Sequence, residues 1–457
     1  MVLPDRCLSL SSSWIRGALY WAVVSLSPMA MALDLSDAYE AALTQDSGIR
    51  AARAAAEAGR ERLPQARSQW LPNVSLNAGR NSNKLDASSP NLLGAIQTSQ
   101  SAYYSQNQSL TLRQTVFNEA KSADYRQAGF QVADSDALLA HELQNLTIRV
   151  GEAYFGALLA EDQLALLLSQ ETLVRTQLDA AKKLFESGAG TRTDIDEVQA
   201  RLDLNTAQLL EARQSVDYAQ QLLSVLMNQP VAQLAPLDAT SLDFSPLQQP
   251  ISLIQWQAQA DQSSPELQIL EARQQAARLQ IEKNRAGHLP TVDVVAQWSS
   301  SDSEYVTQLN TNYNTRSLGI QLSLPLFAGG YVNSMVRQAI AEHVRSQEML
   351  EVTRRDLHLR LHKEFRGVTE GVLRVKALEQ AVHSAGQVVI SSEKSAQAGL
   401  RTQLDILKAE ALKMESMRDL AQARYTYLLS KLRLAVLAGM TAQNSINDIN
   451  GYLLKNR

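Results

Sequence analysis

Several features that other protein classes depend on are scarce in this sequence. Its single cysteine, Cys7, lies near the N-terminus, so the rest of the chain has no disulfide, thiolate metal site or cysteine nucleophile. Aromatic residues make up only 5% of the chain, while Ala, Leu and Gln are frequent, which favours long helices over a β-sandwich. The net charge is −4, with no basic block, so nothing indicates a nucleic-acid partner.

Long apolar runs are also missing. After the N-terminal region, no stretch reaches the ~18 uninterrupted apolar residues of a membrane-spanning helix. The N-terminal region itself has the form of a secretory signal: Arg6 and Arg16 precede an apolar run at residues 17–27, and Ala30 and Ala32 are small residues where a signal peptidase reads. Residues 1–32 are therefore predicted to be a signal peptide. An exported chain without a spanning helix is either periplasmic or held in the outer membrane by strands.

The chain contains an internal repeat. Residues 70–74 (WLPNV) recur as residues 288–292 (HLPTV), an offset of 218, and residues 185–194 recur as residues 396–405, an offset of 211. Repeats at a fixed offset indicate repeated structural units. We therefore expect two copies of one helix–strand–strand–helix–helix unit.

The expected elements follow from hydrophobic periodicity and from glycine and proline. Residues 109–117 and 317–324 alternate polar and apolar side chains, which is typical of strands with one wet and one apolar face. In repeat 1, residues 33–230, we predict a helix over 33–69, kinked at Pro64, strands at about 73–83 and 108–117, and helices over 118–187 and 191–229. In repeat 2, residues 265–441, we predict a helix over 265–286, strands at about 291–300 and 316–325, and helices over 331–398 and 402–438. Residues 231–264 are expected to be an equatorial linker, residues 442–457 a C-terminal tail, and the polar stretches 81–108 and 299–315 extracellular loops.

The longest predicted helices have the spacing of coiled coils. Leu139, Leu143, Leu146 and Val150 follow at intervals of four, three and four residues. A helix over residues 118–187 would be about 105 Å long. Each long tract is interrupted once by a glycine-containing turn, with Gly188 and Gly399 as helix ends and Thr193 and Thr402 as caps of the helices that follow.

Four strands in one chain cannot close a barrel in a membrane, because their edges would leave backbone N–H and C=O groups unpaired in lipid. Three chains would supply twelve strands, and a closed barrel has no edges. The predicted fold class is therefore mainly α with a transmembrane β part. It comprises two tandem repeats, a long coiled α-helical barrel, and a 12-stranded β-barrel shared by a homotrimer.

These residues resemble the TolC family of outer-membrane efflux and type I secretion proteins. The resemblance covers nearly all of residues 33–439 and depends on the doubled unit, the GHLP motif at 287–290, the GGYVNS motif at 329–334 and the paired glycine turns. It implies a passive channel in the outer membrane that extends into the periplasm, not an enzyme, with no cofactor. It also implies as partners a periplasmic adaptor protein, an inner-membrane ABC or proton-driven transporter, and outer-membrane lipid.

The resemblance also implies a gate at the periplasmic end. By position, Asp405 falls on an acidic pore constriction, and Asp194 and Arg401 fall on positions that pair to hold neighbouring helices shut. Family members often carry a second acidic residue three positions after the first, where this chain has Lys408. A ring of Asp405 and Lys408 could neutralise itself, which puts strong cation selectivity in doubt. An alternative role for Asp194 is that of a carboxylate at a helix N-terminus.

Two other classes of protein remain as alternatives. A periplasmic or surface coiled-coil protein without channel activity would explain the helices but not four alternating strands. An enzyme finds little support: His358 and His362 share a helix face, but the sequence shows no third metal ligand. Within the channel interpretation, protein secretion and drug efflux remain open, because the sequence does not identify the exported substrate.

Overall fold

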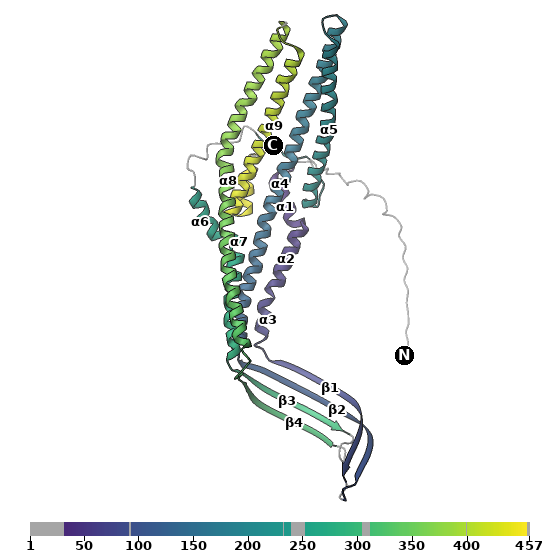
Figure 1. Cartoon of the computed structure of the whole chain (residues 1–457), viewed down its shortest axis with the longest axis vertical. Coiled ribbons are helices and arrows are strands. Elements are labelled where there is room, and N and C mark those ends of the chain that lie inside the picture. Colours follow the sequence, from purple (N-terminus) through teal and green to yellow (C-terminus); the bar gives the residue numbers. More distant parts are fainter. Residues whose placement is uncertain are drawn as a thin grey trace, which may run out of the picture.

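The computed structural model describes residues 32–90, 93–231, 233–238, 252–303, 311–398 and 400–454. In this part the chain is long and narrow, with long helices along one axis and one β-sheet that bends away at one end (Figure 1). Residues 1–31, and with them nearly all of the predicted signal peptide, lie outside the described residues.

The described helices differ widely in length. They are α1 Leu35–Gln45, α2 Ser47–Arg60, α3 Arg62–Ser68, α4 Glu119–Glu186, α5 Arg192–Met227, α6 Leu253–Ser263, α7 Pro265–Arg285, α8 Tyr331–Gln397, α9 Gln403–Leu437 and α10 Ala442–Asn450. Helix α4 has 68 residues and α8 has 67, so each is about 100 Å long at the α-helical rise. Helix α4 packs along α5 and α7, and α8 packs along α7 and α9. The bounds of α4, α5, α8 and α9 lie within two residues of those predicted.

The prediction of one opening helix, kinked at Pro64, is wrong. The segment forms three helices, α1, α2 and α3, because Asp46 leaves the helical conformation with a ψ of 124° and caps α2 by accepting a hydrogen bond from the Ile49 N–H. Pro64 lies in the first turn of α3. A proline there lacks only an N–H that has no partner within the helix, so it is tolerated without a kink.

Four strands form one antiparallel sheet in the order β1-β2-β3-β4. They are β1 Asn73–Pro90, β2 Ile96–Phe117, β3 Thr291–Ser303 and β4 Thr311–Ser323. The register places apolar side chains opposite one another, so that one face carries Val74, Leu76, Leu110, Leu112, Val294, Ala296, Leu318, Ile320 and Leu322. On the opposite face of the same strands, polar residues prevail, and Arg113 donates to the Gln321 Oε1 at 3.4 Å.

The strands extend well into the stretches predicted to be loops. Strand β1 has 18 residues and β2 has 22, and their pairing continues to Pro90 opposite Ile96. Polar Ser, Asn and Gln side chains do not prevent the backbone hydrogen bonds of an antiparallel ladder, so the ladder continues beyond the apolar band. Strand β4 ends at Ser323 rather than at residue 325, because Pro325 has no N–H to donate.

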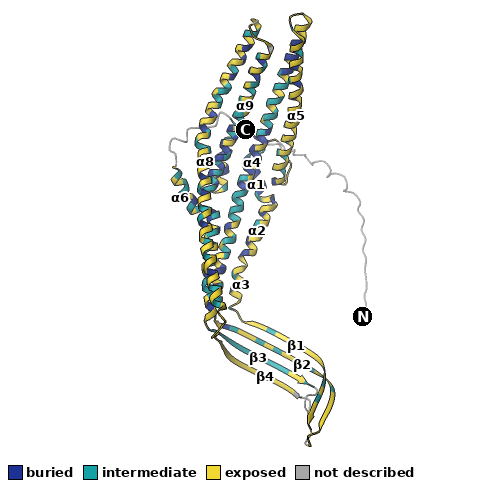
Figure 2. Cartoon of the chain, in the orientation of Figure 1, coloured by how far each residue is buried: buried dark blue, intermediate teal, exposed yellow. Residues whose placement is uncertain are grey.

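Two pairs of long helices, α4 with α5 and α8 with α9, form two helical hairpins. The helical core lies about midway along the helical part, where these two hairpins pack against each other. Figure 2 shows most of the buried positions on the facing sides of the helices, whereas the strands are largely exposed. Tyr154 and Phe155 of α4 form an edge-to-face pair with ring centroids 5.7 Å apart, and Phe155 also contacts Tyr425 of α9. Leu428 and Leu432 of α9 are fully buried beside them. This cluster joins the first hairpin to the second.

Three distant parts of the chain meet beside this core. Leu33 forms a parallel bridge with Leu234, and Leu237 forms an antiparallel bridge with Leu453. The Tyr154 hydroxyl lies 2.9 Å from the carbonyl oxygen of Leu33 and 3.1 Å from that of Ala235. We call this group of contacts the equatorial belt.

Two helices near the belt were not predicted. Helix α6 lies in the expected linker and begins with a capping box in which Ser252 and Gln255 bond each other's backbone N–H groups. Helix α10 lies in the expected tail, and its Ile446 and Ile449 are buried in the same core cluster as Tyr154. Both helices are short, and burial against other elements rather than helix propensity stabilises short helices.

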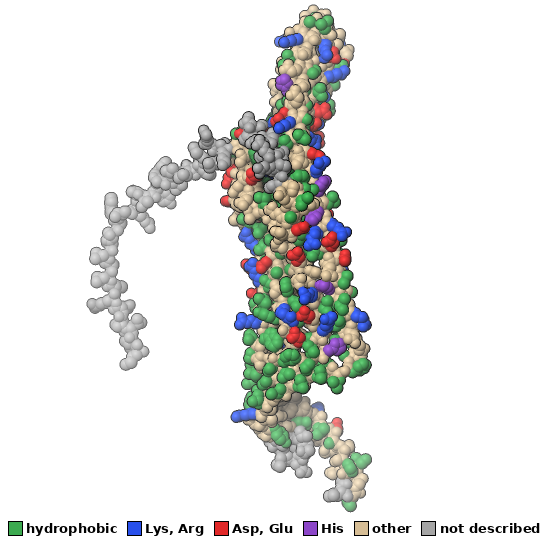
Figure 3. Space-filling model, turned by 90° about the vertical axis from the view of Figure 1, so that its left-hand side faces the viewer, with side chains coloured by type: hydrophobic (Ala, Val, Ile, Leu, Met, Phe, Trp, Pro, Cys, Tyr) green, Lys and Arg blue, Asp and Glu red, His purple; other side chains and the backbone are tan. Residues whose placement is uncertain are grey.

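Charged side chains of both signs are scattered over the helices, without a block of one sign, on the face that Figure 3 shows. Of the helices in the described ranges, none combines the length and the apolar character needed to cross a membrane.

Candidate pore constriction at the helix tips

The sequence-predicted gate residues lie at the end of the molecule opposite the sheet. There one turn joins α4 to α5 and another joins α8 to α9 (Figure 1). Because α4 and α8 are each about 100 Å long, the two turns lie far from the strands. The residues predicted to form a constriction are thus brought to one end by the geometry of the hairpins.

The turn from α4 to α5 combines a helix stop with a helix start. Gly188 has a φ of +76°, a left-handed conformation that glycine adopts without the cost borne by other residues. Thr191 then caps α5: its Oγ1 accepts from the Asp194 N–H at 3.2 Å, and Asp194 Oδ2 accepts from the Thr191 N–H at 2.9 Å. Thr193 is therefore not the cap, contrary to the prediction, and lies inside the first turn of α5.

The turn from α8 to α9 repeats this capping box 211 residues later. Thr402 Oγ1 accepts from the Asp405 N–H at 3.3 Å, and Asp405 Oδ2 accepts from the Thr402 N–H at 3.0 Å. Thr402 is the cap, as the sequence predicts. Gly399, the other residue predicted for this turn, lies outside the described residues. Applying the repeat offset to Thr402 would have identified Thr191 from sequence alone.

Asp405 carries its negative charge in this setting. Hydrogen bonds from the Thr402 backbone and side chain lower the pKa of Asp405, and the nearby positive charges of Arg401 and Lys408 lower it further. The side chain is partly exposed to solvent. An acidic group with these properties can interact with ions in the surrounding water.

Asp194 and Arg401 do not contact each other within one chain. Asp194 is occupied by its cap, and Arg401 Nη1 donates to the Ser392 Oγ at 2.9 Å. Ser392 is buried, so this bond ties the turn to the end of α8. A link between Asp194 and Arg401 therefore stays a prediction, and it would have to join neighbouring subunits.

Lys408 lies on a groove between α5 and α9 with a volume of about 410 Å³. Glu197 and Arg201 of α5 line the same groove, together with Leu404 and Leu407 of α9. Asp405 is not among its lining residues. The two charges predicted to form a mixed ring thus differ in their surroundings, since Lys408 faces the other hairpin.

A buried polar pair just behind the tips was not predicted. Gln177 of α4 donates to the Glu410 Oε2 of α9 at 2.6 Å, and both side chains are buried. Burial raises the pKa of Glu410, and the Gln177 hydrogen bond and Lys413 oppose that rise while Glu393 adds to it. Both residues occupy positions that look like ordinary polar sites in the sequence, so only the packing reveals this contact between the hairpins.

Thr402→Ala is expected to destabilise the start of α9. A capping Thr replaced by Ala costs about 0.5–2 kcal/mol, because the Asp405 N–H loses the Thr402 hydroxyl as an acceptor and keeps only the Thr402 carbonyl oxygen. Amide hydrogen exchange at residues 403–405 should then be faster in the variant. Thr426→Ala is the matched control, since that hydroxyl only bonds the Gln422 carbonyl one turn back within α9. Equal exchange in Thr402→Ala and wild type would contradict the cap.

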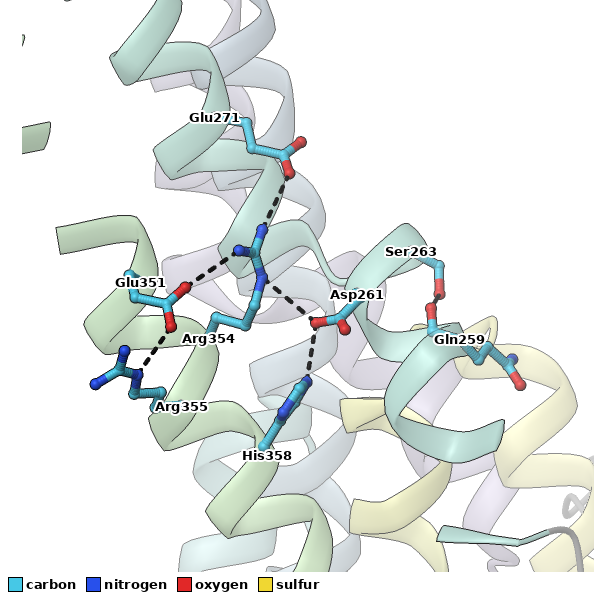
Figure 4. Close-up of polar contacts among 8 residues, drawn as sticks. All are labelled: Gln259, Asp261, Ser263, Glu271, Glu351, Arg354, Arg355 and His358. Carbon is cyan, nitrogen blue, oxygen red and sulfur yellow. Dashed lines mark hydrogen bonds and ion pairs between the residues drawn. The ribbon is translucent and has the colours of Figure 1, made fainter. Parts of the chain in front are cut away.

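The histidine pair considered as a metal site has a different environment. His358 Nε2 lies 3.0 Å from Asp261 Oδ1, and Arg354 contacts the same carboxylate at 3.6 Å and Glu351 at 3.4 Å (Figure 4). These contacts attach α6 to α8. Across the described ranges, no group of three or more His, Cys, Asp or Glu side chains could hold a metal ion.

Comparisons with known proteins agree on one family. The model of the family described as outer membrane efflux protein matches residues 38–229 and 256–440. The chain is 35% identical to the alkaline protease secretion protein AprF of Pseudomonas aeruginosa over 94% of this chain and 88% of that protein. It is 32% identical to the proteases secretion protein PrtF of Dickeya chrysanthemi, over 96% and 95%. Among solved structures, the Campylobacter jejuni CmeC outer membrane channel matches with a TM-score of 0.75 and 14% identity, over 98% of both chains.

Proposed function

The chain belongs to the outer membrane efflux protein family, and from this membership we propose that it is the outer-membrane channel of a three-part export system. The sheet is the single observation that best supports the proposal. One face exposes Leu318, Ile320 and Leu322 at 77%, 77% and 65%, while the other face of the same strand is polar. Apolar outward and polar inward alternation is the pattern of a barrel wall between lipid and water.

Three copies would complete this barrel. Strands β1 and β4 are the two edges of the sheet, and open edges are not tolerated in lipid. Pairing of β4 with β1 of a partner subunit three times over removes every edge and gives twelve strands. The helices of three copies, each about 100 Å long, would then surround a tube that extends into the periplasm.

The channel is passive in this proposal, without a catalytic role or a cofactor, so a partner must supply the energy for transport. We propose an inner-membrane ABC or proton-driven transporter as that partner, with a periplasmic adaptor between the two.

AprF and PrtF are both named for protease secretion. We therefore favour a protein of the protease class as the exported substrate. Deleting the gene should remove that protein from the culture supernatant. A change in drug sensitivity alone would instead support efflux.

For the gate, we propose that the three copies of Asp405 in a trimer surround the narrow end of the tube. Asp194 of one subunit and Arg401 of its neighbour would hold this end closed. Lys408, which faces the groove toward α5, would moderate the cation preference that three copies of Asp405 create. The helix ends would be kept in place by Gly188, Thr191 and Thr402.

Arg401→Ser or Asp194→Ala should raise the single-channel conductance in planar bilayers. Either change removes one side of the proposed link between subunits, so the closed end loosens. Arg366→Ser is the matched control, because Arg366 pairs with Glu370 on the exposed surface of α8, away from the tips. Conductance unchanged in both gate variants would reject the gate, and the absence of any channel from the wild-type protein would reject the proposed function.

A further inference from the structure

The apolar face of the sheet ends at an edge with basic residues at both sides. Moving along each strand away from the helices, the run of outward apolar side chains stops at one polar residue. These residues are Arg80 on β1, Gln108 on β2, Ser300 on β3 and Arg316 on β4. The two outer strands thus each end their apolar run with an arginine.

The edge slopes across the sheet by an amount that fits a membrane surface. Ala78, Gln108, Ser300 and Asn314 are paired in register and form one row across the sheet. Arg80 lies two residues farther from the helices than this row, and Arg316 lies two residues nearer to the helices. A shift of four residues is about 13 Å along the strands, over about 14 Å across three strand spacings. The edge is therefore inclined by about 43°, and strands of membrane barrels tilt by ≈35–45°. Arg80 and Arg316 then lie at the same height above the bilayer.

The surroundings leave both guanidinium groups available. Each is exposed, and neither forms an ion pair with any residue that the structure describes. The Arg80 guanidinium carbon lies 4.9 Å from the centre of the Tyr104 ring, a stacking contact that leaves N–H groups at the edge of the guanidinium free. Arg316 is opposite Trp298. Farther from the apolar band, Lys84, Asp86 and Asp302 give the same face a mixed charge.

The arginines approach each other only in the assembled barrel. In the proposed trimer, β4 pairs with β1 of the next copy, so Arg316 stands beside Arg80 of the partner subunit at equal height. With strands tilted as above, the two backbones would be about 7 Å apart. Each of the three junctions would carry such a pair, and one chain alone has only half of it.

We propose that each junction binds the phosphate groups of a phosphate-bearing glycolipid of the outer leaflet. The proposal rests on the proposed function, since it requires the barrel. The planar forks of two arginines match phosphate oxygens in geometry and charge. Directly below Arg316 on the same face are Leu318 and Ile320, and below Arg80 are Leu76 and Val74. The acyl chains of a lipid would lie on these residues, which a free anion would not use.

The test uses the trimer purified from outer membranes in a mild detergent and titrated separately with lipid A, phosphatidylcholine and inorganic phosphate. Native mass spectrometry counts the molecules bound. Wild type should retain lipid A in preference to phosphatidylcholine, and Arg80→Gln or Arg316→Gln should each weaken lipid A binding about tenfold, the value of one charged hydrogen bond. Arg316→Lys, which keeps the charge but loses the planar fork, should bind lipid A more tightly than Arg316→Gln and more weakly than wild type.

Arg113→Gln is the matched control, because Arg113 lies on the opposite face of the sheet and donates to Gln321. It should bind lipid A as wild type does. Equal binding of phosphatidylcholine, displacement of lipid A by an equal concentration of inorganic phosphate, or unchanged binding in both Gln variants would overturn the inference. The same preparations are also placed in planar bilayers. Normal channels with unchanged lipid A binding contradict only the lipid site, whereas a wild-type protein that forms no channels contradicts the proposed function.

Discussion

Ile320→Arg is expected to remove nearly all assembled trimer from the outer membrane. Ile320 lies in the middle of the apolar run of β4 and is 77% exposed in the single chain, so in a barrel its side chain would face lipid. Arginine on the lipid face near the bilayer centre costs about 2–4 kcal/mol. The trimer carries the substitution three times, so the total cost is of the order of 10 kcal/mol. The measurement is the yield of heat-dissociable trimer in the outer-membrane fraction.

Ser317→Arg is the matched control for this substitution. Ser317 lies on the same strand but on the opposite face, where its register partner is Gln297, and the proposed barrel places that face toward water. The arginine introduced there should leave the trimer yield close to that of wild type. Equal yields from Ile320→Arg and Ser317→Arg would show that the two faces of β4 meet the same environment, and the barrel would then be wrong.

Gly439→Val is expected to destabilise the helical part by about 3 kcal/mol or more, the range of severe backbone and packing defects. Gly439 has a φ of +76° at the end of α9, a conformation that costs a residue with a side chain about 1–2 kcal/mol. An added Cβ would also lie 2.4 Å from the Ser263 Oγ and 2.6 Å from the Ser263 carbonyl oxygen. The backbone atom cannot turn away as a side chain would, so α6 or α9 must move. The loss should appear as a lower midpoint of thermal dissociation of the trimer.

A second substitution and a second glycine separate the causes. Adding Ser263→Ala to Gly439→Val removes the clash with the hydroxyl but not that with the carbonyl oxygen, so only part of the stability should return. Gly386→Ala is the control: Gly386 lies within α8, and nothing is within 4 Å of an added Cβ there. Alanine in a helix is favoured over glycine by about 1 kcal/mol, so this variant should be at least as stable as wild type. A Gly439→Val protein as stable as wild type would refute the constraint.

Three features of the sequence account for what could be predicted: long tracts without proline, apolar alternation and the internal repeat. The bounds of α4, α5, α8 and α9 follow from tracts without proline that are interrupted only by glycine turns, because a helix continues until a residue stops it. The apolar alternation of β2 and β4 identifies which face of each strand is which, since the side-chain period of a strand is two. The repeat relates the capping box at Thr191 to that at Thr402.

The remainder depends on contacts that no local pattern encodes. The outer parts of β1 and β2 are polar, and they are strands because each provides the other with hydrogen-bond partners. Helices α6 and α10 are too short to be stable by propensity, and α10 forms because Ile446 and Ile449 are buried beside Tyr154. The pair of Gln177 and Glu410 joins residues 233 positions apart, and only the packing of the two hairpins brings them together. By contrast, the lowered pKa of Asp405 arises mainly from hydrogen bonds with Thr402, three residues earlier in the sequence.

The equatorial belt has a consequence for biogenesis. Its bridges join Leu33 to Leu234 and Leu237 to Leu453, and the Leu35 N–H donates to the Asn450 side chain at 3.1 Å. Since a chain emerges from its N-terminus onward, Leu33 can pair with Leu234 well before Leu35 can meet Asn450 or Leu237 can meet Leu453. A product that stopped short of Asn450 would keep its hairpins and the Leu33–Leu234 bridge but lack the contacts of Asn450 and Leu453. The belt is therefore complete only when residues 450–453 are present, and without α10 the buried Leu35 would lose its cover by Ile446 and Ile449.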